Sequence, residues 1–179
     1  MLDKLLKKEI KSSMTVDDIK MACYGWVPVC IDNDLTKSKD FWLKELLTKG
    51  CLIILVLPEG EKSGHFICLI YHKEKFLISF FDGYGINPEE LRSVHLLDFL
   101  GTLSRYYGIE YNRVKHQRLS AQVNNCGDYC IVRCMNKHMV NSDFNKLLVK
   151  KFNITSSDQL IVMMTASYFM GKENFMQNL

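Results

Sequence analysis

The residues Cys51–Leu57, CLIILVL, form a continuous apolar run that ends at Pro58. Such a run, bounded by proline, is typical of a β-strand that is buried on both faces. Two further strand-like runs follow, His65–His72 and Lys75–Phe81, and a short polar turn joins them. We therefore expect a buried strand and a hairpin at the centre of the chain.

Helical patterns lie on both sides of these strands. Thr15 is followed by Asp17 and Asp18, a capping side chain and acids in a first turn, which predicts a helix start. A second helix is predicted from Ser38 to Gly50. The remaining predicted elements are a basic helix in the first dozen residues, helical pattern in one or two pieces from Pro88 to Tyr107, a strand at 109–116, a loop at 117–125, and helices at 126–140, 143–151 and 156–170. This order predicts an α+β fold in one domain spanning 1–179.

The composition excludes several classes of protein. With 47% hydrophobic residues and three prolines in 179 residues, the chain is not intrinsically disordered. The longest apolar run is the seven residues at 51–57, far short of the roughly 20 that span a bilayer. Leucines near the N-terminus alternate with lysines, so we expect no signal peptide, no secretion and no membrane insertion. The net charge of +3 is too small to indicate a nucleic-acid-binding protein.

The seven cysteines are the unusual part of the composition. Their number is odd and no C-x-x-C pair occurs, so we expect reduced thiols in an intracellular compartment, most of them buried. Cys126, Cys130, Cys134 and His138 recur every four residues, which suggests a metal site. Twelve residues of helix extend about 18 Å, too far for ligands of one zinc ion. We therefore expect no metal, and we expect Cys130 and Cys134 to be core residues. A Cys126–Cys130 disulfide is disfavoured by its geometry within one helix.

His65 and Asp82 form the first half of a candidate catalytic site. His65 begins one strand of the predicted hairpin and Asp82 ends the other, so antiparallel pairing brings them together. A carboxylate there can bind one imidazole nitrogen and present the other to a reacting group. Gly64 is expected to leave space around the ring, and Phe66 to cover it.

Cys126 and Gln122 form the second half. Cys126 follows a polar segment and is predicted to be the first residue of a buried helix, where backbone N–H groups favour a thiolate. Gln122 can place its amide beside the Cys126 N–H as an oxyanion hole. Gln117, nine residues before Cys126, is the alternative. A thiol, a base, an orienting carboxylate and an amide donor together predict acyl-transfer chemistry, with no cofactor.

The order of these residues resembles that of a known group of enzymes. Its markers here are Gly64-His65-Phe66, Phe81-Asp82-Gly83, Gln122 and Cys126-Gly127-Asp128-Tyr129-Cys130. They resemble the clan of cysteine proteases that includes the adenovirus maturation protease (adenain) and the ubiquitin-like-protein-specific proteases. The chain departs from the clan in having Phe66 where Trp is usual. It also places Gln122 closer to the cysteine than is usual.

The resemblance implies both a fold and a function. The fold is a central, mostly antiparallel sheet flanked by helices, with the nucleophile at the N-terminus of a buried helix. The function is a monomeric thiol endopeptidase that cleaves viral capsid precursors beside small residues during maturation, in the virion or the host cytoplasm. DNA or a peptide is implied as an activator, because adenain-like proteases use both. The alternatives are a protease that removes ubiquitin-like modifiers, an effector acetyltransferase, and an inactive binding module on the same scaffold.

Overall fold

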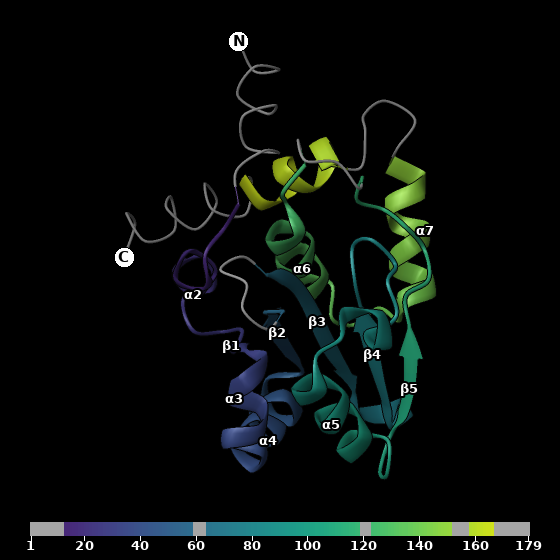
Figure 1. The fold of residues 1–179 in the computed structure, drawn as a ribbon. Helices are drawn as coiled ribbons and strands as arrows, with labels where there is room; N and C mark the ends of the chain where they lie inside the picture. The colour runs from purple at the N-terminus through teal and green to yellow at the C-terminus, as the bar shows by residue number, and fades with distance from the viewer. Residues whose placement is uncertain (1–12, 59–63, 119–122, 152–157, 167–179) are drawn as a thin grey trace, which may run out of the picture.

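The computed structural model describes residues 13–58, 64–118, 123–151 and 158–166. In these residues a five-stranded sheet lies at the centre, with helices packed on both of its faces (Figure 1). The strands follow one another across the sheet in chain order: β1 (Val29–Ile31), β2 (Cys51–Val56), β3 (His65–His72), β4 (Leu77–Phe81) and β5 (Gly108–Tyr111). The predicted α+β class, with its central sheet flanked by helices, is confirmed.

The direction of each strand follows from the connection that precedes it. The central pairs, β2 with β3 and β3 with β4, are antiparallel and are the longest pairings. The edge strands β1 and β5 pair in parallel with β2 and β4. Parallel neighbours require a crossover connection. The crossovers are α3 (Asp32–Lys37) with α4 (Lys39–Lys49), and the 3₁₀-helix η2 (Pro88–Leu91) with α5 (Val94–Leu103).

The sheet separates two hydrophobic cores. One contains side chains of α2 (Val16–Cys23), α6 (Cys126–Met135) and α7 (Asn141–Lys151), and the other contains side chains of α3, α4 and α5. Strand β2 contributes Ile53 to the first core, and Leu52 and Ile54 to the second. Burying each such side chain stabilises the fold by roughly 1.5–3 kcal/mol. The predicted burial of this strand on both faces is confirmed.

Two helix ends lie where local side-chain chemistry predicted them. The Thr15 N–H donates to Asp18 Oδ2 (2.7 Å) and the Asp18 N–H donates to Thr15 Oγ1 (3.1 Å), so a complete capping box begins α2. Gly50 ends α4 with φ +77°, a left-handed conformation that favours glycine, and its N–H donates to the Leu46 carbonyl (2.8 Å). Both predicted boundaries are confirmed.

Other boundaries differ from the prediction. The helical pattern predicted in one or two pieces after Pro88 forms two, which are separated at Arg92 (φ +56°). Ser93, whose hydroxyl accepts the Leu96 N–H, begins α5, which ends at Leu103 rather than near Tyr107. The predicted strand at 109–116 is shortened to β5, and the predicted helix at 126–140 ends at Met135. β1 and α3 were not predicted, because three and six residues are too short to show a clear period.

Of the two helices predicted near the ends of the chain, only the one near the C-terminus lies partly in the described residues. Residues 158–166 are helical, within the helix predicted at 156–170. The helix predicted in the first dozen residues lies outside the described residues. None of the helices in the described ranges is long and apolar enough to cross a membrane.

Candidate active site

His65 and Asp82 meet at one end of the β3–β4 hairpin. His65 is the first residue of β3, and Asp82 directly follows the last residue of β4. The strands are antiparallel, with Phe81 opposite Cys68, so the end of β4 lies near the start of β3. The Nε2 atom of His65 lies 2.7 Å from Oδ2 of Asp82. Hairpin geometry thus brings together the two residues that the sequence suggested as partners.

The carboxylate of Asp82 is completely buried and held from several sides. Its second oxygen, Oδ1, accepts the backbone N–H of Tyr84 (2.6 Å). Its main-chain carbonyl accepts the side-chain N–H of Asn112 (2.8 Å). Because both carboxylate oxygens are engaged, the group cannot rotate freely. It therefore fixes the orientation of the His65 ring.

Cys126 lies within hydrogen-bonding reach of the same ring. It is the first residue of α6 and is only 7% exposed. Burial alone lowers the pKa of His65, but hydrogen bonds to Asp82 and to Cys126, together with their charges, raise the pKa to about 10. Nε2 is engaged by Asp82, which leaves Nδ1 available to the Cys126 sulfur. Near neutral pH the ring therefore carries a proton between a carboxylate and a thiol.

The start of α6 also presents backbone N–H groups and the positive end of the helix dipole. Among the described residues, the N-cap Asn125 makes no side-chain hydrogen bond to the first turn. The first N–H groups of an α-helix have no partner within the helix and carry its positive partial charge. This end of the helix can therefore stabilise negative charge at or near the Cys126 sulfur.

Two glycines allow the backbone segments of the site to approach closely. A Cβ atom at Gly64 would lie 2.3 Å from the Val56 carbonyl oxygen, so only glycine fits where β3 begins beside β2. A Cβ atom at Gly127 would lie 3.0 Å from Cδ1 of Ile19, which comes from α2. Gly64 therefore has a backbone reason to be glycine, and the expected space around the His65 ring stays a prediction.

The aromatic ring that covers His65 comes from Tyr84. The two rings are stacked, with centroids 4.9 Å apart and an interplanar angle of 29°. Phe66, which we expected in this role, is 3% exposed and belongs to the core on the α6 side. Tyr84 was missed because it lies in the turn after Asp82, where no strand period predicts the side-chain direction. Its position two residues after a candidate carboxylate was the available signal.

Of the two candidate oxyanion glutamines, Gln117 lies in the described part of the chain, and Gln122 lies outside the described residues. Gln117 is 1% exposed, and its side-chain amide has no hydrogen-bond partner among the described residues. Its Oε1 would lie 2.9 Å from a Cβ atom at Gly83, the residue after Asp82. The buried amide of Gln117 therefore lies next to the Asp82 turn.

The other cysteines are core residues. All seven cysteines lie in the described part of the chain, and each is a free thiol there. Cys130 and Cys134 are completely buried, as predicted, and their thiols are hydrogen-bonded with those of Cys51 and Cys68. His138, the fourth member of the spacing pattern, is exposed. The described residues contain no group of three or more His, Cys, Asp or Glu side chains arranged to hold a metal ion.

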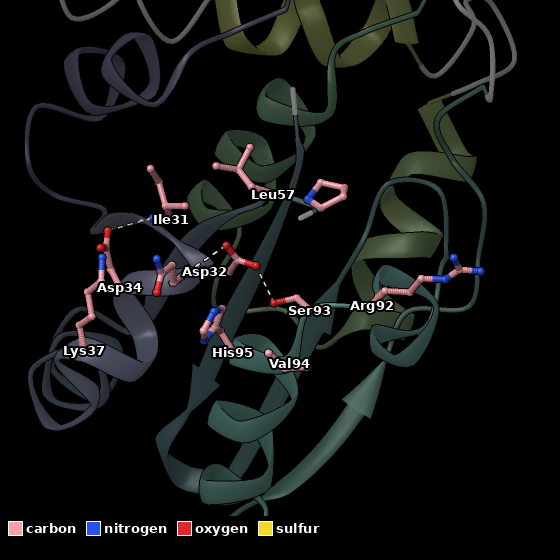
Figure 2. A pocket seen from close by; sticks show the side chains of 11 residues that line it. Ile31, Asp32, Asp34, Lys37, Leu57, Arg92, Ser93, Val94 and His95 are labelled. Carbon is pink, nitrogen blue, oxygen red and sulfur yellow. Dashed lines mark hydrogen bonds between the residues drawn. The ribbon is translucent and has the colours of Figure 1, made fainter. Parts of the chain in front are cut away.

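A separate cavity of about 570 Å³ opens near the starts of α3 and α5 (Figure 2). Leu57 and Pro58, just after β2, form part of its wall. Asp32 accepts hydrogen bonds from the Ser93 hydroxyl (2.5 Å) and from the Asn33 N–H (2.9 Å). None of the residues that line this cavity belongs to the His65, Asp82 and Cys126 group.

A comparison of sequences found one viral relative. No protein-family model matches the chain. The chain is 25% identical over 126 residues to the protein named "Uncharacterized protein V9" of Sputnik virophage. The aligned region covers 63% of this chain and 71% of that protein. At this identity the likeness does not establish a family.

Solved structures provide two further comparisons. The first is the Chlamydia trachomatis effector protein Cdu1 bound to ubiquitin, with a TM-score of 0.45, 16% identity, and coverage of 100% of this chain and 81% of that chain. The second is the C-terminal Ulp1 protease domain in complex with Smt3, the yeast ortholog of SUMO. It has a TM-score of 0.38, 12% identity, and coverage of 93% and 72%. With TM-scores below 0.5, the chemistry must be derived from the residues of this chain.

Proposed function

We propose that this chain is a cysteine endopeptidase formed by a single domain over 1–179. The observation that carries the proposal is the shared His65 ring, with Asp82 on one side and the Cys126 thiol on the other. A cysteine sulfur beside a protonated imidazole, at the start of a helix, lies where its thiolate form is favoured, which is the environment of a reactive nucleophile. The buried Asp82 carboxylate is the third group of the site, and it orients His65, the proposed base.

The reaction follows from the placement of these groups. In the reactive state, Cys126 is a thiolate paired with protonated His65. Its sulfur attacks the carbonyl carbon of the scissile peptide bond, and the negative charge passes to the carbonyl oxygen. The proton of His65 moves to the leaving amine, and the Cys126 acyl-thioester remains. The neutral His65 then takes a proton from water as the water oxygen attacks the thioester carbonyl. The C–S bond breaks, the carboxylic acid product leaves, and the Cys126 thiolate and protonated His65 are restored. Asp82 keeps its place beside Nε2 throughout, because both of its oxygens are held.

The proposed substrates are viral structural precursor proteins, cleaved at sites that contain glycine or other small residues. The resemblance of the motifs to the adenain-like proteases implies this cleavage preference, and the likeness to a virophage protein supports a viral setting. A protease for ubiquitin-like modifiers is the second candidate, since the same residue order occurs in that class. The two solved neighbours are bound to ubiquitin and to Smt3.

A substrate panel separates these candidates. The purified chain is incubated with glycine-containing peptides copied from capsid precursors, and with fusions that carry a ubiquitin-like modifier at their N-terminus. We expect cleavage of the capsid peptides, identified by mass spectrometry of the products, and none by a Cys126→Ala control. Cleavage of the modifier fusions alone would favour the second candidate. No cleavage of either class, with or without added DNA, would contradict the proposed endopeptidase.

The oxyanion donor is tested by two matched variants, Gln122→Ala and Gln117→Ala. The motif order favours Gln122, whereas the unpartnered buried amide beside Gly83 favours Gln117. Removing one oxyanion-hole donor lowers kcat by about 10²–10³. We expect a loss of this size in one of the two variants only, with KM nearly unchanged, as measured by steady-state kinetics. Full activity in both variants would exclude a glutamine donor.

A further inference from the structure

A buried carboxylate outside this group of residues lies against the helix turn that carries Cys126. Asp158 is the first described residue of the helical segment 158–166 and is 1% exposed. In Figure 1 this segment, drawn in yellow-green, lies near the N-terminal end of α6. A buried charge is retained only where it is paired or hydrogen-bonded, so the contacts of Asp158 indicate what it does.

Asp158 holds residues on both sides of the nucleophile in the sequence. The Tyr129 hydroxyl donates to Oδ1 of Asp158 (3.2 Å), and the Asn125 side-chain N–H donates to its main-chain carbonyl (3.3 Å). Asn125 directly precedes Cys126, and Tyr129 lies one helical turn further along α6. Both residues are completely buried. Asp158 therefore contacts the first turn of α6 at two points that flank Cys126.

An arginine from a third segment completes the arrangement. Nε of Arg118 lies 3.5 Å from Oδ2 of Asp158, and the arginine itself is largely exposed. Burial raises the pKa of Asp158, whereas the hydrogen bond from Tyr129 and the charge of Arg118 lower it. The pKa of Tyr84 rises to about 12 through its burial and the charges of Cys126, Asp82 and Asp158. Asp158 is therefore within electrostatic reach of the ring that covers His65.

We propose that Asp158 is a positioning residue, which fixes the first turn of α6, and with it the Cys126 sulfur, relative to His65. The inference rests on the proposed function and extends it to the segment 158–166. The Asp158 carboxylate acts through the Tyr129 hydroxyl, while the main-chain carbonyl of the same residue holds Asn125. Reacting groups must lie within about 3–3.5 Å of each other, and a displacement of about 1 Å can cost about 10²-fold in rate. Loosening this turn should therefore slow the chemical step.

The test compares Asp158→Asn, Asp158→Ala and Tyr129→Phe with the unaltered chain. Asp158→Asn keeps the size and removes the charge, whereas Tyr129→Phe removes only the hydroxyl group. We expect kcat to fall about tenfold or more in Asp158→Ala, with KM changed less than twofold. Because Asp158 acts partly through Tyr129, the double variant Asp158→Asn with Tyr129→Phe should lose less than the product of the two single losses.

Thr165→Val is the matched control. Thr165 is buried in the same helical segment, and its hydroxyl donates to the Ile161 carbonyl (3.0 Å) within that segment. The control should lower the thermal unfolding midpoint without changing kcat. If Asp158→Asn and Asp158→Ala lower only the midpoint, as the control does, the positioning role is wrong. If Asp158→Ala does not fold, Asp158→Asn decides by the same criteria.

A second readout is independent of peptide cleavage. The rate at which iodoacetamide alkylates Cys126 near neutral pH is followed by mass spectrometry of the peptide that contains it. We expect this rate to change at least threefold in Asp158→Ala and to stay unchanged in Thr165→Val. An unaltered alkylation rate in both Asp158 variants would overturn the inference. If the unaltered chain cleaves no substrate, the proposed function fails, while this measurement still tests the link between Asp158 and the thiol.

Discussion

Replacing Cys126 by alanine is expected to abolish peptide cleavage, with kcat at least about 10⁴-fold lower, because no other group can form the thioester. Cys130 is the next thiol on α6, and it is completely buried in the core, so it cannot take over the role. The measurement is steady-state cleavage of the best substrate of the panel. Residual activity above a hundredth of the original rate would contradict the assignment of Cys126 as the nucleophile.

The same variant should keep its fold. Only the sulfur atom is removed, and the site is at a helix end rather than at the centre of the core. Cys126 is one of the groups that raise the pKa of His65, so this pKa should fall in Cys126→Ala while Asp82 keeps it above its ordinary value. Histidine NMR titration measures the shift. Cys126→Ser is the matched control, because it keeps a hydrogen-bonding group beside the ring with a much weaker nucleophile.

Asp82→Asn is expected to lower kcat by about 10⁴-fold with little change in KM. The two carboxylate oxygens face two donors, the backbone N–H of Tyr84 and Nε2–H of His65. An asparagine presents one oxygen and one NH₂ group, so it can accept only one of these hydrogen bonds. The other donor then loses its partner, or His65 changes tautomer and turns an N–H toward Cys126. An Asp82→Asn enzyme with more than a tenth of the original kcat would contradict the orienting role of Asp82.

The variant also has an expected pH dependence of stability. In the folded chain the pKa of His65 is raised from 6.5 to about 10. A raised histidine pKa contributes stability that is complete below pH 6.5 and is lost as the pH rises toward 10. Asp82→Asn removes the carboxylate whose hydrogen bond and charge raise this pKa, so it should destabilise the chain most near pH 6 and least near pH 10. Urea unfolding of both proteins at these two pH values measures the difference, and an equal difference at both would contradict the pairing.

Local sequence patterns were sufficient for features whose causes lie within a few residues. The apolar run at 51–57 predicted a strand buried on both faces, because only a central strand with a core on each side can bury every side chain. Thr15 and Gly50 predicted helix ends because capping depends on neighbouring backbone groups. His65 and Asp82 could be predicted as neighbours because a hairpin brings the start of one strand to the end of the next.

The catalytic roles of His65, Asp82, Cys126 and the glutamine stay predictions until the variants are measured. The positions of these residues in the fold could nevertheless be predicted from the sequence to different extents. The position of Cys126 at the start of α6 followed from a change of period after a polar segment. Its distance from His65 depended on how α6 packs on β3, which no local pattern describes. The role of a glutamine depends on the path of the chain between Gln117 and Cys126, and sequence order left two candidates.

By itself, the sequence determined the α+β class, the central hairpin, several helix ends and the order of the candidate catalytic residues, because these depend on side-chain period and short-range hydrogen bonds. Only the tertiary structure decided that the edge strands pair in parallel. It alone showed that Tyr84 rather than Phe66 covers His65, and that Asp158 contacts the turn of Cys126. Those contacts join residues that are far apart in the chain or lie in irregular turns. Their geometry is set by the packing of whole elements, which the pattern of any one segment does not contain.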